Sequence, residues 1–157
     1  MAARKPIVVN SGELQQLQAG DTLDAPVTGG DVVSLTPAAT LIAGAIVYIS
    51  AADACNKAKA DASGTSIAFG LAVAAITSGV AGFIKTDGLL SLTTGEWDAV
   101  FGTTGGLTAG TQYYLSKDTA SFGTATAPSA VGQYVVYIGL GVSTTELMIA
   151  LGRRLLL

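Results

Sequence analysis

The strongest signal in the sequence is the segment Leu41-Ile-Ala-Gly-Ala-Ile-Val-Tyr-Ile-Ser50, which lines up with Leu107-Thr-Ala-Gly-Thr-Gln-Tyr-Tyr-Leu-Ser116. A second pair follows in the same order, Ile67-Ala-Phe-Gly-Leu-Ala-Val73 with Val136-Tyr-Ile-Gly-Leu-Gly-Val142. The spacing between copies changes from 66 residues at the first pair to 69 at the second, so the second copy needs only a slightly longer loop. Each copy has a Leu-x-Ala-Gly turn before a strand and a Gly-Leu-x-Val strand that returns.

This repeat predicts the fold class. Hairpins in β proteins of simple composition can look alike by chance, but two matches in the same order favour a true repeat. Neither unit can bury its apolar face alone, whereas two together can. We therefore predict an all-β fold, a small barrel or sandwich built from two repeated hairpin units, with an extended N-terminal arm. The arm spans residues 1–30, and the β domain spans 31–157 with copies at about 41–90 and 107–157.

Short strands are also indicated by turn residues that recur about every eight to twelve positions. The strand candidates, rich in Val, Ile and Tyr, are residues 31–35, 45–50, 67–75, 81–85, 113–116, 134–142 and 147–151. Residues 32–52 and 62–84 are uncharged over a length that can cross a bilayer. Ser, Thr and Gly interrupt both stretches, so we expect no membrane span. Residues 51–62 and 96–101 are expected to be loops with at most one helical turn.

The composition limits the chemistry that the chain can perform. It has 157 residues, a formal net charge of -3, no His and one Cys. Without imidazole it lacks the usual general base near neutral pH and the commonest metal ligand, and a single thiol can form neither an internal disulfide nor a Cys-rich zinc site. The negative net charge also argues against a nucleic-acid partner. We therefore expect no enzyme, no catalytic residue, no cofactor and no metal.

Paired carboxylates are the remaining acid–base candidates, and they are Asp21, Asp24 and Asp31, and Glu96 and Asp98 around Trp97. Two carboxyls beside an aromatic ring would suit a glycosidase, and Asp21-Thr-Leu-Asp24 would suit part of a calcium site. Acidic residues in Gly-rich turns more often accept hydrogen bonds from their own backbone, so we expect neither. Cys55 is expected to be a small core residue. Tyr113 and Tyr114 are adjacent, so in a strand one of them faces solvent or a partner.

The two ends of the chain are the candidate interfaces. Residues 1–30 hold a short strand at 7–10 and an amphipathic stretch at 13–18, too few apolar residues for a core. The chain ends in Arg153-Arg-Leu-Leu-Leu157, although free ends are normally polar. Burying one Leu is worth roughly 1.5–3 kcal/mol, so we expect these leucines to pack on the chain's own barrel or on another subunit. The candidate interface residues are Arg4, Lys5, Ile7, Val9, Leu14, Leu17, Arg153, Arg154, Leu155, Leu156 and Leu157.

Residues 5–23, Lys-Pro-Ile-Val-Val-Asn-Ser-Gly-Glu-Leu-Gln-Gln-Leu-Gln-Ala-Gly-Asp-Thr-Leu, together with Gly44–Ser50 and Gly105–Ser116, resemble structural proteins of tailed-bacteriophage virions. Similar stretches occur in capsid decoration (cement or head-fibre) proteins and in pieces of tail fibres. The resemblance covers most of the chain and its motifs are compositional, so no family residue is carried over individually.

The resemblance implies a small homotrimeric β protein without enzymatic activity, made in the host cytoplasm and attached to the outer surface of a phage head. Its partners would be the major capsid protein and other copies of itself, with no nucleic acid and no membrane, and its role would be to reinforce capsomer junctions. The alternative is a tail-fibre or receptor-binding component of the phage tail. A full fibre usually carries a long shaft and a tip, for which 157 residues leave little room.

Overall fold

The computed structural model describes residues 31–157 in full and, of the N-terminal region, only the backbone of two strands. Strands β1 (Ile7–Asn10) and β2 (Glu13–Gln16) pair antiparallel as a hairpin, which confirms the strand predicted at 7–10. The rest of the predicted arm lies outside the described residues, as do the interface candidates Arg4, Lys5 and Leu17 and the side chains of Ile7, Val9 and Leu14.

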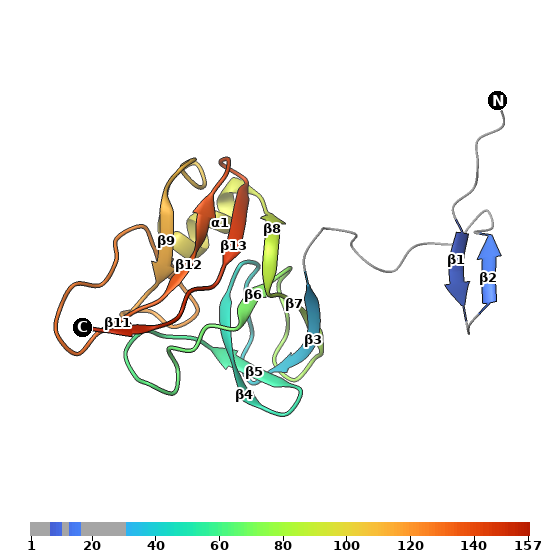
Figure 1. Cartoon of the computed structure of the whole chain (residues 1–157), viewed down its shortest axis with the longest axis horizontal. Coiled ribbons are helices and arrows are strands. Elements are labelled where there is room, and N and C mark those ends of the chain that lie inside the picture. Colours follow the sequence, from blue (N-terminus) through green and yellow to red (C-terminus); the bar gives the residue numbers. More distant parts are fainter. Residues whose placement is uncertain (1–6, 11–12, 17–30) are drawn as a thin grey trace.

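Residues 31–157 form a nearly all-β body, as predicted, which also contains one helix (Figure 1). Its first half is a closed barrel with the strand order β3-β5-β4-β6-β7. The strands are β3 (Val32–Pro37), β4 (Ile46–Ala51), β5 (Ala54–Lys57), β6 (Gly70–Ala72) and β7 (Gly82–Lys85). We call this barrel the first unit. Its interior is filled by the buried side chains of Leu35, Leu41, Ala45, Val47, Cys55, Ala72, Ile76 and Ile84.

The second half is an open five-stranded sheet with the order β10-β9-β12-β13-β8, which we call the second unit. Its strands are β8 (Asp87–Ser91), β9 (Gln112–Leu115), β10 (Gly123–Thr124), β12 (Tyr137–Gly141) and β13 (Glu146–Ala150). Helix α1 (Thr94–Phe101) lies between β8 and β9 in the chain. A separate two-stranded ribbon joins β11 (Tyr134–Val135) to β14 (Leu155–Leu156).

The two units repeat one strand order with one register. In the first unit Ile46 lies opposite Leu71, and in the second Gln112 lies opposite Leu140, which are the positions that the sequence repeat equates. The outer strands agree as well, because β3 pairs with β7 as β8 pairs with β13. Each unit therefore builds its own sheet, instead of giving half of a shared barrel.

The turn that opens each repeat has the same backbone geometry. Gly44 and Gly110 adopt left-handed φ angles of 78° and 77°, a conformation open to glycine at little cost. Gly44 donates its N–H to Ala72 O, and Gly110 donates to Gly141 O, each at 2.8 Å. The shared Leu-x-Ala-Gly motif thus specifies one turn in both places.

Strand β8 belongs to the second unit even though residues 87–91 fall within the range expected for the first copy. It pairs with β13 over five consecutive residues. Each unit therefore begins one strand before its Leu-x-Ala-Gly turn, and the recognisable motif marks the second strand of each unit.

The units differ in how the sheet is completed. In the first, β3 and β5 pair in parallel, with Thr36 N–H bonded to Asp53 O at 2.9 Å. In the second, β8 and β10 remain the two edges of the sheet, and α1 occupies the interior instead. A Cβ at Gly123 on β10 would lie 2.0 Å from the Phe101 ring, so only glycine lets this strand approach the helix.

Helix α1 corrects the prediction of a loop at 96–101. Thr93 caps it through a reciprocal capping box, in which its hydroxyl accepts from Glu96 N–H and Glu96 accepts from Thr93 N–H. Gly102 ends it with φ of 66°. The loop predicted at 51–62 is also wrong, because Ala54–Lys57 forms β5. Partners on β3 and β4 supply the pairing that its weak β propensity does not suggest.

The larger core cluster lies between the two units. It joins the buried first-unit residues Ile46 and Leu71 to the aromatic residues Trp97, Phe101 and Tyr113. Phe101 packs on Tyr113 with ring centroids 4.4 Å apart and on Trp97 at 5.7 Å. The second unit is therefore filled by α1 on one side and by the outside of the barrel on the other.

Candidate assembly surface

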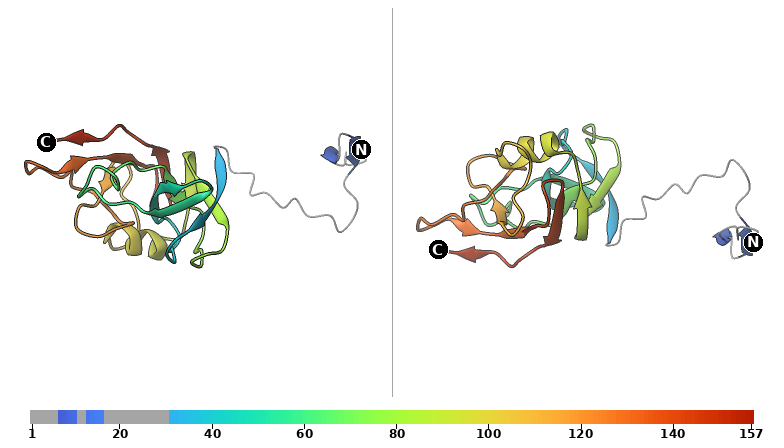
Figure 2. Two further views of the ribbon diagram at one scale, coloured as in Figure 1. Left: turned by 90° about the horizontal axis from the view of Figure 1, so that it is seen from below. Right: turned by 90° about the horizontal axis from the view of Figure 1, so that it is seen from above.

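The C-terminal leucines form an exposed strand. Leu155 and Leu156 belong to β14, and their side chains are 60% and 56% exposed, while Leu157 is 38% exposed. Figure 2 shows β14 and β11 side by side at the end of the body where the chain terminates. None of the three leucines belongs to either buried core cluster.

One edge of this ribbon is open for pairing. Leu157 donates its N–H to Gln133 O at 3.0 Å and accepts from Gly132 N–H at 2.8 Å. Backbone groups of successive residues in an antiparallel strand point to opposite sides, so the N–H and C=O of Leu156 point away from β11. We call residues 153–157 with β11 the C-terminal ribbon.

Arg154 fixes the base of the C-terminal ribbon to the body. Its Nη1 donates to the carbonyl oxygen of Ser63 and, at 3.3 Å, to Oγ of the buried Ser66. Its guanidinium carbon lies 5.4 Å from the centre of the Tyr134 ring, in a cation–π arrangement. Arg153 and Arg154 are both exposed, but only Arg154 has contacts within the chain that hold it in place.

A second apolar surface lies on the outer face of the second unit. Leu140 and Met148 are cross-strand neighbours, and Met148 also lies opposite Leu89 on β8. Leu140 is 37% and Met148 41% exposed, and Leu89 is half-buried. We call these three residues the outer row. They alternate with the buried Leu147, Ile149 and Leu90, which face the core.

Tyr114 and Tyr137 extend the outer row at the β9 end of the sheet. Their rings are 5.9 Å apart with an edge-to-face tilt, and the Tyr114 hydroxyl donates to Gln112 Oε1 at 2.6 Å. Burial, with Tyr114 nearby, raises the pKa of the Tyr137 hydroxyl above its usual range. Tyr113 is buried and Tyr114 is half-exposed, which confirms that the two adjacent tyrosines face opposite ways.

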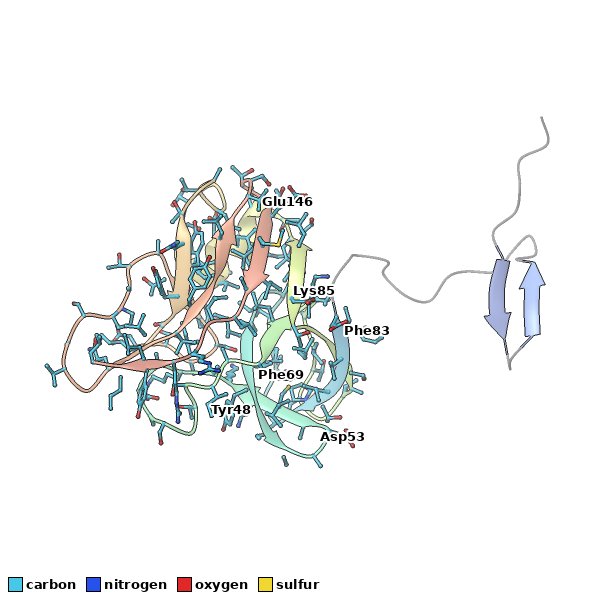
Figure 3. The ribbon with its side chains drawn as sticks, viewed as in Figure 1. Tyr48, Asp53, Phe69, Phe83, Lys85 and Glu146 are labelled. Carbon is cyan, nitrogen blue, oxygen red and sulfur yellow. The ribbon has the colours of Figure 1, made fainter. Side chains whose placement is uncertain are left out.

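Carboxylates flank the outer row at both ends of its strands. Asp87 precedes Leu89 on β8, and Glu146 precedes Met148 on β13, each two residues away and therefore on the same face. Figure 3 shows Glu146 at the start of β13. Asp87 Oδ1 accepts from Asp31 N–H at 2.6 Å, and Glu146 Oε2 accepts from the Ser143 hydroxyl at 3.2 Å.

The acidic residues near Trp97 have structural partners. Asp98 accepts from Gly106 N–H and the Thr103 hydroxyl, both at 2.8 Å, and these bonds lower the pKa of its carboxyl. Glu96 belongs to the capping box, which lowers its pKa too. Trp97 is fully buried and donates Nε1–H to Thr145 O at 2.9 Å. This set holds backbone in place and presents no aromatic platform to a sugar.

Cys55 lies in the barrel core, where burial raises the pKa of its thiol. In the described part of the chain, no helix is long and apolar enough to cross a membrane, and no group of three or more Cys, Asp or Glu side chains lies within reach of a common metal ion. Asp21 and Asp24 fall outside it.

A smaller apolar patch lies on the barrel. Tyr48 and Phe69 (Figure 3) are both half-buried, and they line one shallow pocket together with the exposed Ile49 and Ile67. The patch adjoins the loop that Arg154 holds, so it belongs to the same side of the body as the base of the C-terminal ribbon.

Two comparisons with known proteins give no match that would assign a function to this surface. No protein-family model matches the chain, and no curated protein matches it significantly.

Sequence reasoning identified the C-terminal leucines but missed the outer row. Leu140 lies in the Gly-Leu-x-Val motif, and its repeat equivalent Leu71 is fully buried, so the motif alone suggests a core residue. The signal that separates the two is the neighbour across the strand, which is Gln112 for Leu140 and Ile46 for Leu71. A polar residue at that position marks an outer face that the rest of the chain leaves exposed.

Proposed function

We propose that this protein is a structural component of a tailed-phage virion, a homotrimer that binds the outer surface of the head and reinforces the junctions between capsomers. The major capsid protein is its partner there, and it is synthesised in the host cytoplasm. Residues 1–23 make the capsid contact, and the β body carries the contacts between copies.

The observation that carries the proposal is the exposed run Leu155–Leu157. Three consecutive leucines lie on a ribbon that Arg154 fixes to the body, and they expose apolar side chains on both of its faces for contact with another protein. Isolated exposed leucines need no explanation, but a contiguous apolar surface on a small protein marks an interaction site. A protein that reinforces a capsid by adding contacts between subunits needs such a surface.

The chemistry of the described residues supports the same role. The carboxylates best placed for acid–base work, Glu96 and Asp98, are occupied in holding a helix cap and a glycine turn. Their lowered pKa values keep them ionised near neutral pH, whereas a general acid needs a raised pKa.

The test is to locate the protein on virions of the phage that encodes it. Gold-labelled protein, viewed by negative-stain microscopy, is expected over the whole head. Label confined to the tail tip would replace the proposal with the tail-fibre function, and unlabelled virions would overturn both.

A deletion of residues 2–18 sharpens the test. We expect head occupancy to collapse while the thermal unfolding midpoint changes little, because the β body of residues 31–157 has its own cores. The matched control is Val80→Asp, an exposed change on the barrel, which should leave both measurements unchanged. Full occupancy after the deletion would place the capsid contact elsewhere on the molecule.

A further inference from the structure

The first unit shows how the face equivalent to the outer row becomes buried. Its members Leu140 and Met148 correspond in register to Leu71 and Lys85 of the first unit. Both of those side chains are fully buried, and Leu71 packs in the larger core cluster under the second unit. The same face of the same strand pattern is therefore an internal interface in one unit and exposed in the other.

We propose that the outer row of one copy is covered by the C-terminal ribbon of a second copy of this chain. The inference rests on the proposed self-association and names its two surfaces. Both are apolar and exposed in the single chain, one as a broad sheet face and one as a projecting strand. Leu156 of the ribbon, which points to the face of β14 opposite Leu155, would take the place that the second unit takes over Leu71.

The charges around the two surfaces favour this pairing. Asp87 and Glu146 flank the outer row, and the exposed Arg153 lies two residues before the leucines of the ribbon. The ion pairs between described residues are Lys59 with Asp61 and Lys117 with Asp118. The flanking carboxylates Asp87 and Glu146 belong to neither pair.

The contact joins two different patches, because each copy contributes one ribbon and one outer row. Such heterologous contacts close into rings when the rotation between copies allows it, and otherwise continue as filaments. A ring of three agrees with the proposed trimer. A two-fold dimer, by contrast, would place the same patch on both sides.

Engineered cysteines test the contact directly. Two preparations, Met148→Cys and Leu156→Cys, are mixed and oxidised; the native Cys55 is buried and takes no part. A disulfide needs the two Cα atoms within about 7 Å, so we expect a cross-linked pair from the mixture. The matched control replaces Met148→Cys with Val80→Cys, which is also exposed but lies on the barrel. Equal yields from the two mixtures, or Leu156→Cys linking mainly to itself, would overturn the proposal.

Light scattering gives the second measurement. Met148→Asp and Leu156→Asp should each weaken self-association about tenfold or more, since a charge would replace an apolar contact at the centre of the interface, while Val80→Asp should not. Circular dichroism checks that each variant is folded, and a variant that fails to fold is replaced by Leu140→Asn. A wild-type chain that stays monomeric at every concentration, or a Met148→Asp variant that assembles normally, would overturn the inference.

The two proposals fail separately. Cross-linking without label on the head would leave the self-contact standing and remove the capsid role. Label on the head without cross-linking, on virions or in solution, would do the reverse and would make the capsid protein the occupant of the outer row.

Discussion

The first unit closes its sheet into a barrel through backbone hydrogen bonds. The second unit leaves its sheet open and fills its core with the side chains of α1. The parallel pairing of β3 with β5 closes the barrel around small and branched side chains such as Val47, Ala72 and Ile84. In the second unit the connection from β8 to β9, residues 92–111, is longer than its counterpart at 38–45 and carries α1. Its aromatic residues fill the space that strand pairing closes off in the first.

This difference explains why one outer face is covered and the other exposed. The open second unit leaves its interior accessible, and the outside of the barrel, with Ile46 and Leu71, fills it. The second unit thus takes its partner from within the chain, and its own outer row has no third unit to cover it. When each repeat unit covers the outer face of the unit before it, a chain of two units leaves one outer face uncovered.

The largest expected effect comes from removing the side chain that fills the second unit. Trp97→Ala should lower the free energy of unfolding by about 3–5 kcal/mol, the usual cost of deleting a large buried aromatic, measured by urea denaturation. Phe83→Ala, on the exposed outside of the barrel, is the control and should cost below about 1 kcal/mol. Similar losses for the two variants would mean that α1 is not the core of the second unit.

A second prediction tests whether the two sheets are equally tight at equivalent positions. A Cβ at Gly70 would lie 2.6 Å from Lys85 O, and one at Gly139 would lie 2.3 Å from Met148 O. Gly70→Ala and Gly139→Ala should each cost about 1–3 kcal/mol, because two backbones must separate. Gly64→Ala, with open space around the Cβ, should be nearly neutral. A neutral result at one of the paired glycines would break the equivalence of the units.

The sequence predicted the repeated parts of this fold better than the unrepeated ones. The Leu-x-Ala-Gly and Gly-Leu-x-Val motifs identified strands that the structure pairs in one register, since side-chain alternation and turn glycines are local properties. Strand β10 is only Gly123–Thr124 and carries no apolar signal. It exists because β9 pairs with it and because Gly123 admits Phe101, both of which are contacts distant in sequence.

Helix α1 could have been predicted from its ends. Thr93 and Glu96 have the spacing of a capping box, and Gly102 stands where a helix ends. Its apolar stripe is short because only Trp97, Val100 and Phe101 are buried, so the periodicity was weak. The outer row was harder to predict, because its sequence signal, Gln112 at the position equivalent to Ile46, is informative only once the strand pairing is known.

A third prediction separates the cost of backbone conformation from the cost of contact between units. Gly110→Ala should cost about 1–2 kcal/mol, since its left-handed φ strains any Cβ while the surrounding space is open. Gly44→Ala has the same φ, but its Cβ would lie 3.0 Å from both Leu92 and Val100 of the second unit. It should therefore cost more, and the difference measures how firmly the units press together. Equal losses would mean that Leu92 and Val100 move aside freely.

The smallest expected effect concerns acid and the capping box of α1 in the second unit. The capping box lowers the pKa of Glu96 below its usual value of 4.5, chiefly through the bond from Thr93 N–H. A carboxyl whose pKa is lower folded than unfolded adds stability above the unfolded value, and this stability is lost as the pH falls through the folded pKa. Glu96→Gln keeps an acceptor oxygen but cannot titrate, so it should flatten the fall in unfolding midpoint below about pH 4.5. Thr93→Ala should flatten it only in part, because it removes the hydroxyl donor but keeps the backbone N–H that bonds Glu96. The double variant should flatten it no further than Glu96→Gln alone, because the titrating carboxyl is already gone, whereas a further flattening would show that Thr93 acts on the acid response independently of Glu96.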